Sequence, residues 1–231
     1  RKNLSLLLLF SFLLSGQSFV PTVFLAYLAL IFSVLIANTL KTKRVKTALV
    51  VGGVILAANA FWLIPYTYGI PSNSAIIQKS RINQFSSEEI FYRNKSFGDL
   101  KSVLGLNGFV MDSVEYDITK DQNTYLMQSW RNYQQTLFYV VSYLAFLGTA
   151  IFGVYSAIKK KQTEVLSIGL AGSVAFFFLA NNTIVLEQLN GLIRWILPVV
   201  GEAFRFPFTK FITLFSFSLS VFVGFGFVSL L

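Results

Sequence analysis

The chain has 231 residues, of which 55% are hydrophobic, with 25 Phe, no Cys, no His and a net charge of +9. So large an apolar share, gathered in blocks, excludes a soluble domain and predicts a polytopic membrane protein. The lack of Cys and His in the sequence excludes disulfides, thiolate chemistry and the usual zinc and iron sites. An acid, base or metal site would therefore depend on Asp or Glu.

The positive charge is concentrated in short stretches rather than spread over the chain. Nine of the 19 basic residues belong to Arg1-Lys2, Lys41 to Lys46 and Lys159 to Lys161. Basic residues in short loops between spans mark the cytoplasmic side of a membrane protein. The long polar segment 67–135 has seven basic and seven acidic residues and is neutral. No basic surface interleaved with aromatic residues remains, so we expect no nucleic-acid partner.

Apolar segments alternate with these loops along the chain. Six of them are predicted to cross the membrane: 4–15, 23–37, 48–65, 136–158, 165–180 and 211–231. Alternate crossing places every basic cluster on one side, so we expect an all-α integral membrane protein of about six transmembrane helices. The start at Arg1 and the end inside an apolar run at Leu231 also lead us to expect a piece of a longer protein.

The predicted spans divide the chain into three parts. Residues 1–66 contain the first three spans, 67–135 form an extracytoplasmic loop or cap, and 136–231 contain the last three spans. The membrane is expected to be the plasma membrane of a bacterium or archaeon, with the basic loops in the cytoplasm. Residues 67–135 and 181–209 are then extracytoplasmic.

The third span ends in polar and aromatic residues, namely Asn59, Trp62, Pro65 and Tyr66. An aromatic anchor at the outer interface is the favoured interpretation. The alternative is a pocket, in which Pro65 unwinds the end of the helix and exposes carbonyl groups. Asn59 is interpreted as an interhelical hydrogen-bonding residue more readily than as a ligand contact.

The outer loop is predicted to be a small folded cap. Capping-box patterns begin at Ser86 and at Ser96, and Val110 to Ile118 is a candidate strand or extended segment. Four acidic side chains could bind a divalent cation or act as a base, although a solvated surface is the favoured interpretation. These are Asp112, Glu115, Asp117 and Asp121.

A charged segment lies between the last two predicted spans. Residues 184–197 form an amphipathic helix in this interpretation, with Glu187, Asn190, Gly191 and Arg194 on one side. A helix of this length measures about 20 Å, too short for a hydrocarbon core of about 30 Å. We therefore expect it to lie in the membrane interface with its apolar side in lipid.

Arg205 follows this helix in a strongly apolar stretch that contains Glu202 and Pro207. Its guanidinium could bind an anion such as a phosphate, pair with Glu202, or reach toward lipid headgroups. Lys210 could add a second positive charge to an anion site, and Arg194 is a weaker candidate for the same role.

Two motifs carry a resemblance to a known family. Asn59-Ala-Phe-Trp-Leu-Ile-Pro65 and Gly201-Glu-Ala-Phe-Arg-Phe-Pro-Phe-Thr-Lys210 resemble the downstream membrane region of GT-C-type membrane glycosyltransferases and their YfhO-like bacterial relatives. The resemblance implies an outward-facing cavity, a polyprenyl-phosphate-linked sugar donor and a glycan or lipid acceptor. It assigns the lipid phosphate to Arg205, and less securely to Lys210.

The resemblance also places the catalytic carboxylate in the first outer loop of the full protein. The first outer turn here, Gly16 to Pro21, has no Asp or Glu. Either the part that carries the catalytic residue is missing from this chain, or this chain does not catalyse. A divalent cation is expected only in the full protein, and no cofactor is expected within this chain.

The expected function is that of a fragment of a membrane glycosyltransferase acting in cell-envelope glycan or glycolipid synthesis. One alternative is a transporter or flippase for lipid-linked glycans, which would require charges at the centres of spans or matching broken helices in two halves. A non-catalytic membrane scaffold is the other alternative.

Overall fold

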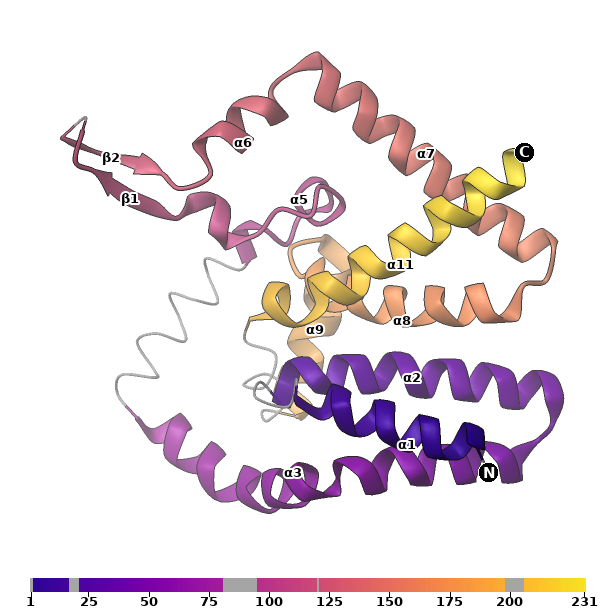
Figure 1. Ribbon diagram of the computed structural model, residues 1–231. Coiled ribbons are helices and arrows are strands. Elements are labelled where there is room, and N and C mark those ends of the chain that lie inside the picture. Colours follow the sequence, from indigo (N-terminus) through magenta and orange to yellow (C-terminus); the bar gives the residue numbers. More distant parts are fainter. Residues whose placement is uncertain (1, 17–20, 81–94, 120, 198–205) are drawn as a thin grey trace.

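The computed structural model describes residues 2–16, 21–80, 95–119, 121–197 and 206–231, and these are mostly helical (Figure 1). A two-stranded antiparallel hairpin is the exception to the predicted all-α fold. The elements in chain order are α1 (Lys2–Leu14), α2 (Pro21–Thr42), α3 (Val45–Lys79), α5 (Leu100–Leu104), the 3-10 helix η2 (Phe109–Asp112), β1 (Val114–Asp117), β2 (Gln122–Tyr125), α6 (Gln128–Gln134), α7 (Leu137–Lys159), α8 (Thr163–Leu179), α9 (Ile184–Ile196) and α11 (Pro207–Leu230).

Among the described residues, three helical stretches are long and apolar enough to cross a membrane: Val45–Asn73, Leu137–Lys159 and Pro207–Leu230. A fourth results only if α8 and α9, which meet at an angle of 86°, count as one broken span. The predicted number of six spans is therefore not confirmed. The helix α1 has 13 residues, which at about 1.5 Å per residue falls short of a hydrocarbon core of about 30 Å.

The third helix does not end where the sequence predicted. The helix α3 continues through Pro65 and Pro71 to Lys79, so the predicted boundary after residue 66 falls inside a helix. The prediction that Pro65 unwinds the helix end is wrong for the same reason. Proline is tolerated inside membrane helices, where neighbouring helices and hydroxyl side chains can satisfy backbone groups. Beside Pro65 the Thr67 hydroxyl donates to the carbonyl oxygens of Leu63, at 2.8 Å, and Ile64, at 3.0 Å, although neither is the carbonyl of Phe61 that Pro65 leaves without its helical donor.

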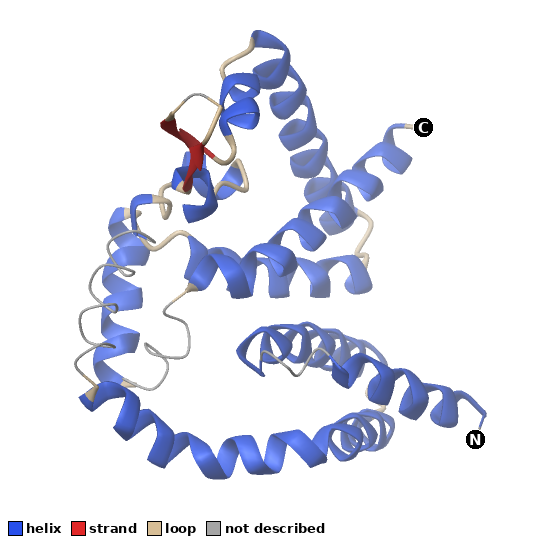
Figure 2. Ribbon diagram, turned by 60° about the vertical axis from the view of Figure 1, so that its left-hand side comes forward, coloured by secondary structure: helices blue, strands red, loops and turns tan. Residues whose placement is uncertain are grey.

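The helices form two groups, visible in Figures 1 and 2. In one, α11 packs against α7 and α8; in the other, α3 packs against α1 and α2. The groups meet where α2 packs on α8. The core of the first group consists of α5, α8 and α11 side chains that are at most 6% exposed: Val103, Ala171, Ala175, Leu179, Ala180, Phe211, Leu214 and Phe215.

The crossing of α7 and α11 depends on glycine. A Cβ atom on Gly153 would overlap the carbonyl oxygen of Phe222, and one on Gly226 would overlap the carbonyl oxygen of Thr149. Small residues at such contacts let two helix backbones approach closely, which is the main source of attraction between helices that cannot gain from the hydrophobic effect in lipid.

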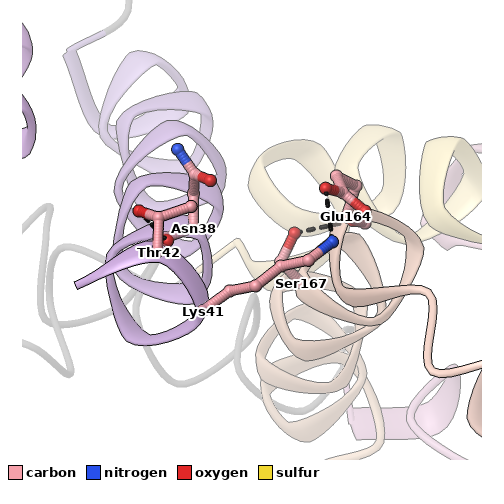
Figure 3. Close-up of polar contacts among 5 residues, drawn as sticks. All are labelled: Asn38, Lys41, Thr42, Glu164 and Ser167. Atoms are coloured by element: carbon pink, nitrogen blue, oxygen red, sulfur yellow. Dashed lines mark hydrogen bonds and ion pairs between the residues drawn. The ribbon is translucent and has the colours of Figure 1, made fainter. Parts of the chain in front are cut away.

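The two internal basic loops lie at one end of the molecule, together with the chain termini (Figure 1). Lys41, at the end of α2, forms an ion pair of 3.1 Å with Glu164, at the start of α8 (Figure 3). Lys160 donates to the Ser229 hydroxyl near the end of α11, at 3.1 Å. The two internal basic clusters thus lie together, because helix lengths and directions bring them to the same end, whereas the cytoplasmic side assigned to them stays a prediction.

The opposite end carries the cap, built from α5, η2, the hairpin and α6. The strands pair from Val114 opposite Tyr125 to Asp117 opposite Gln122, which confirms a strand inside the predicted segment 110–118. Asp99, rather than the predicted Ser96, caps α5: its Oδ1 accepts from the backbone N–H of Ser102 at 3.1 Å. The predicted capping box at Ser86 lies outside the described residues.

Candidate functional site

At the capped end the chain turns sharply between α8 and α9. The two helices meet at 86°, and the Asn190 side chain secures the turn by donating to the Phe177 carbonyl oxygen at 2.9 Å. The helix 184–197 predicted from sequence is confirmed to within one residue, as Ile184–Ile196. If α8 follows the membrane normal, α9 lies close to the membrane plane.

The two sides of α9 have different surroundings. Asn190, on the polar side, is 5% exposed, whereas Val185, Leu189 and Leu192 on the apolar side are 64%, 44% and 50% exposed. Asn190 therefore faces the protein, and much of the apolar side is open. This is the arrangement that an interfacial helix needs, with apolar side chains available to lipid.

The cap is fastened to this turn by polar contacts and by its own apolar residues. Lys95 pairs with Glu187 of α9 at 2.6 Å, and the backbone N–H of Asn182 donates to the Gly98 carbonyl oxygen at 3.1 Å. Val103 of α5 is 2% exposed and belongs to the core of α8 and α11. The cap is thus part of the packed fold and not a free loop.

A cleft of about 730 Å³ separates the cap from the first two turns of α7. Its walls contain carboxylate, amide, hydroxyl and cationic side chains beside aromatic rings. The polar and aromatic lining residues are Ser96, Phe97, Asp99, Lys101, Ser102, Asn107, Asp112, Arg131, Gln134, Gln135, Tyr139 and Tyr143. Such a mixture suits a ligand with many hydroxyl groups, because amides and carboxylates bond hydroxyls and aromatic faces contact apolar edges.

Arg131 forms the ionic side of the cleft. Its guanidinium donates to the Asp112 carboxylate at 3.0 Å and to the Met111 carbonyl oxygen at 2.9 Å, and it lies 4.0 Å from the centre of the Tyr125 ring. These contacts join α6, η2 and the hairpin. The three contacts hold the planar group in one orientation, and both Arg131 and Asp112 line the cleft.

Tyrosines and amides form a further part of the lining. The rings of Tyr139 and Tyr143 stack with centroids 5.7 Å apart and an interplanar angle of 6°. Gln134 Nε2 donates to Asn107 Oδ1 at 2.7 Å. The Tyr143 hydroxyl is buried and has no hydrogen-bond partner among the described residues. An unpaired buried hydroxyl is unfavourable, so this group is the strongest local reason for a polar ligand.

Asp99 is the carboxylate of the cleft whose ionisation is shifted. Partial burial raises the pKa of Asp99, but hydrogen bonds from the Ser102 side chain and backbone outweigh burial and hold the pKa below its ordinary value. The group is therefore ionised near neutral pH and available as a hydrogen-bond acceptor.

Two of the three predicted phosphate-binding residues, Lys210 and Arg194, belong to described helices. Lys210 occupies the first turn of α11, is 8% exposed, and has its Nζ 5.3 Å from the centre of the Phe206 ring. Pro207 is the buried first residue of α11 and Arg194 belongs to the last turn of α9. Arg205 and Glu202 lie outside the described residues.

The predicted residues of α3 form a separate cluster. Asn59 is 1% exposed, donates to the Ile55 carbonyl oxygen at 2.9 Å and accepts from Trp62 Nε1 at 2.9 Å. Both bonds stay within α3, so the interhelical interpretation of Asn59 is wrong; Trp62 is one turn away and supplies the donor. Trp62 also contacts the rings of Phe24 and Tyr66, whereas Pro65 is exposed.

The acidic residues of the cap do not converge. Asp112 pairs with Arg131, Asp117 accepts from Thr119, and Asp121 accepts from the Tyr116 hydroxyl. That last bond raises the pKa of Tyr116 above its ordinary value. No group of three acidic side chains among the described residues could hold a metal ion.

Sequence reasoning missed most residues of the cleft. A signal was present: Gln134 and Gln135 directly precede an apolar span whose first turns contain Tyr139 and Tyr143 four residues apart. Neither a protein-family model, nor a curated protein, nor a solved structure matches the chain.

Proposed function

We propose that the chain is the membrane part of a glycosyltransferase-like protein that handles a polyprenyl-phosphate-linked sugar on the extracytoplasmic side of a bacterial or archaeal plasma membrane. The observation that carries this proposal is the cleft of about 730 Å³ beside the first two turns of α7. It has the polar and aromatic lining that a sugar requires, and it opens at the end of a helix able to span the membrane.

The lipid part of the substrate would approach along α9. Its exposed apolar side, with Val185 64% and Leu192 50% exposed, favours contact with a polyprenyl chain in the interface. The pair formed by Lys95 and Glu187, 2.6 Å apart, supports a direct connection, because Ser96, the next residue, lines the cleft. A lipid-linked sugar could thus have its chain beside α9 and its head in the cleft.

The phosphate of the lipid-linked sugar would be bound by basic residues of the segment 194–210. Arg205 is the leading candidate, and Lys210 and Arg194 are the other two. In the proposed reaction these cations stabilise the phosphate as negative charge develops on the departing oxygen. A carboxylate supplied elsewhere in the full protein would activate the acceptor hydroxyl.

Lipid binding to the purified chain in nanodiscs tests whether the protein recognises the phosphate group. Native mass spectrometry would compare polyprenyl phosphate with the uncharged polyprenol. We expect the phosphate to bind more tightly, and Arg205→Gln or Arg194→Gln to weaken it about tenfold each, the effect of one charge-assisted hydrogen bond. Lys161→Gln, in the other basic loop at the opposite end, is the matched control and should leave binding unchanged.

Recognition of the sugar is tested by measuring the binding of polyprenyl-phosphoryl glucose and polyprenyl-phosphoryl mannose. At least one should bind more tightly than polyprenyl phosphate, and Tyr143→Phe, which removes only the unpaired hydroxyl, should reduce that gain. Equal binding of phosphate and alcohol, or no gain from either sugar, would refute the proposal.

A further inference from the structure

A second recess lies far from the cleft, between α2 and α3 near the basic end. It measures about 480 Å³ and is lined by eleven residues that are apolar apart from one threonine and two glycines. Those along its length include Leu35, Ile36, Leu40, Leu49, Gly53 and Leu56. The proposed function does not use this groove.

The floor of the groove is open because a glycine stands where a side chain would fill it. A Cβ atom on Gly53 would meet no atom within 4 Å. Leu40 and Leu49 on the flanks are 66% and 71% exposed. The groove therefore has the shape and surface of a trough for a hydrocarbon chain running alongside two membrane helices.

The basic end of the groove is closed by the turn between α2 and α3. Lys43, Arg44 and Lys46 are all exposed there, and none forms an ion pair with a residue that the structure describes. Lys41 differs, since Glu164 of α8 holds its ammonium at 3.1 Å (Figure 3). Three cations are thus available beside the apolar trough.

We infer that this groove binds one anionic phospholipid, with an acyl chain along Gly53 and Leu49 and the headgroup phosphate at Lys43, Arg44 and Lys46. Acyl chains gain little by leaving bulk lipid for an apolar groove, because both surroundings are equally apolar. The selectivity must therefore come from charge, at about fivefold for each basic residue near the membrane surface. Three cations predict a preference over a neutral lipid of about a hundredfold.

Competition between two lipids of identical acyl chains tests the inference. The purified chain would be mixed with phosphatidylglycerol and phosphatidylcholine, and the lipids retained by the protein would be counted by native mass spectrometry. The triple variant Lys43→Gln, Arg44→Gln, Lys46→Gln should abolish the preference for phosphatidylglycerol. Gly53→Leu, which fills the trough, should lower the number of retained phosphatidylglycerol molecules by one.

Each variant has a matched control. The triple variant Lys159→Gln, Lys160→Gln, Lys161→Gln removes equal charge from the other basic loop at the same end. Gly148→Leu adds the same side chain to α7, where a Cβ atom also meets nothing within 4 Å. Both controls should keep the preference and the number of bound lipids.

Three results would overturn the inference. An equal loss of preference in both triple variants would mean diffuse surface charge, and equal retention of the two lipids by the unchanged chain would mean ordinary solvation of the groove. A dimer that Gly53→Leu dissociates would mean that a second copy of the chain occupies the groove.

Discussion

The close crossing of α7 and α11 makes a quantitative prediction about Gly153. A Cβ atom there would lie 2.8 Å from the Phe222 carbonyl carbon and 3.0 Å from the Gly226 nitrogen, closer still to the Phe222 carbonyl oxygen. Ordinary van der Waals contact for such an atom begins at 3.4 Å. All three obstacles are backbone atoms, so no side-chain rotation can relieve the overlap and the two helices must separate.

The cost of that separation can be isolated with a second alanine variant. Replacing Gly by Ala in a helix contributes up to about 1 kcal/mol of stability through propensity alone. Overpacking a tight contact costs about 1–3 kcal/mol. Gly148→Ala lies on the same helix and meets nothing within 4 Å, so it reports propensity only. The unfolding free energies of Gly153→Ala and Gly148→Ala should therefore differ by about 1–3 kcal/mol.

Reversible unfolding in mixed micelles, followed by circular dichroism, would measure this difference. Gly224→Ala and Gly226→Ala form an equivalent pair on α11, because Gly224 is open and a Cβ atom on Gly226 would overlap the Thr149 carbonyl oxygen. If Gly153→Ala were as stable as Gly148→Ala, the helices would not cross at these glycines and the packing described for α7 and α11 would be refuted.

Two further predictions concern the cap and α3. Because hydrogen bonds from Ser102 hold the pKa of Asp99 below its ordinary value, the stability that Asp99 contributes is complete above the unfolded pKa and is lost as pH falls through the folded pKa. The protection factors of the α5 amides against hydrogen exchange should fall on acidification below about pH 4, and Asp99→Asn should remove that fall; a fall of the same size in the variant would contradict the assignment. In α3, Trp62→Phe leaves the buried Asn59 Oδ1 without its donor and should cost about 1–3 kcal/mol in the same micelle unfolding assay. Trp195→Phe, at a side chain that is 80% exposed, should change stability little, and equal effects of the two would argue against the Asn59 bond.

Local sequence signals predicted the elements that depend on neighbouring residues alone. Thr136 was the predicted start of the fourth apolar segment, and it caps α7 by accepting from the Tyr139 backbone N–H at 3.2 Å. The period of apolar residues predicted α9 to within one residue. Capping and helical periodicity act over one to four positions, so they can be read directly from the chain.

Predictions that depended on helix-breaking residues were less successful. Proline normally ends or kinks a helix, yet α3 passes through Pro65 and Pro71. A local rule for proline does not say whether the rest of a membrane helix outweighs the loss of one backbone hydrogen bond. The predicted hydrogen bond of Asn59 to another helix was wrong because Trp62, three residues further along α3, already supplies a donor to Asn59 Oδ1.

Composition and charge pattern by themselves determined that this is a membrane-type helical protein with its basic loops at one end, since these properties are sums over local residues. Only tertiary packing decided the cleft, because its wall residues come from segments as far apart as Ser96 and Tyr143 and no short pattern connects them. Tertiary packing also decided which basic residues form ion pairs within the described residues. Glu164, from a different helix, pairs with Lys41, whereas Lys43 and Arg44 remain exposed beside the groove. Side chains distant in sequence become neighbours through helix crossings, and these are set by close backbone contacts such as that of Gly153 with Phe222.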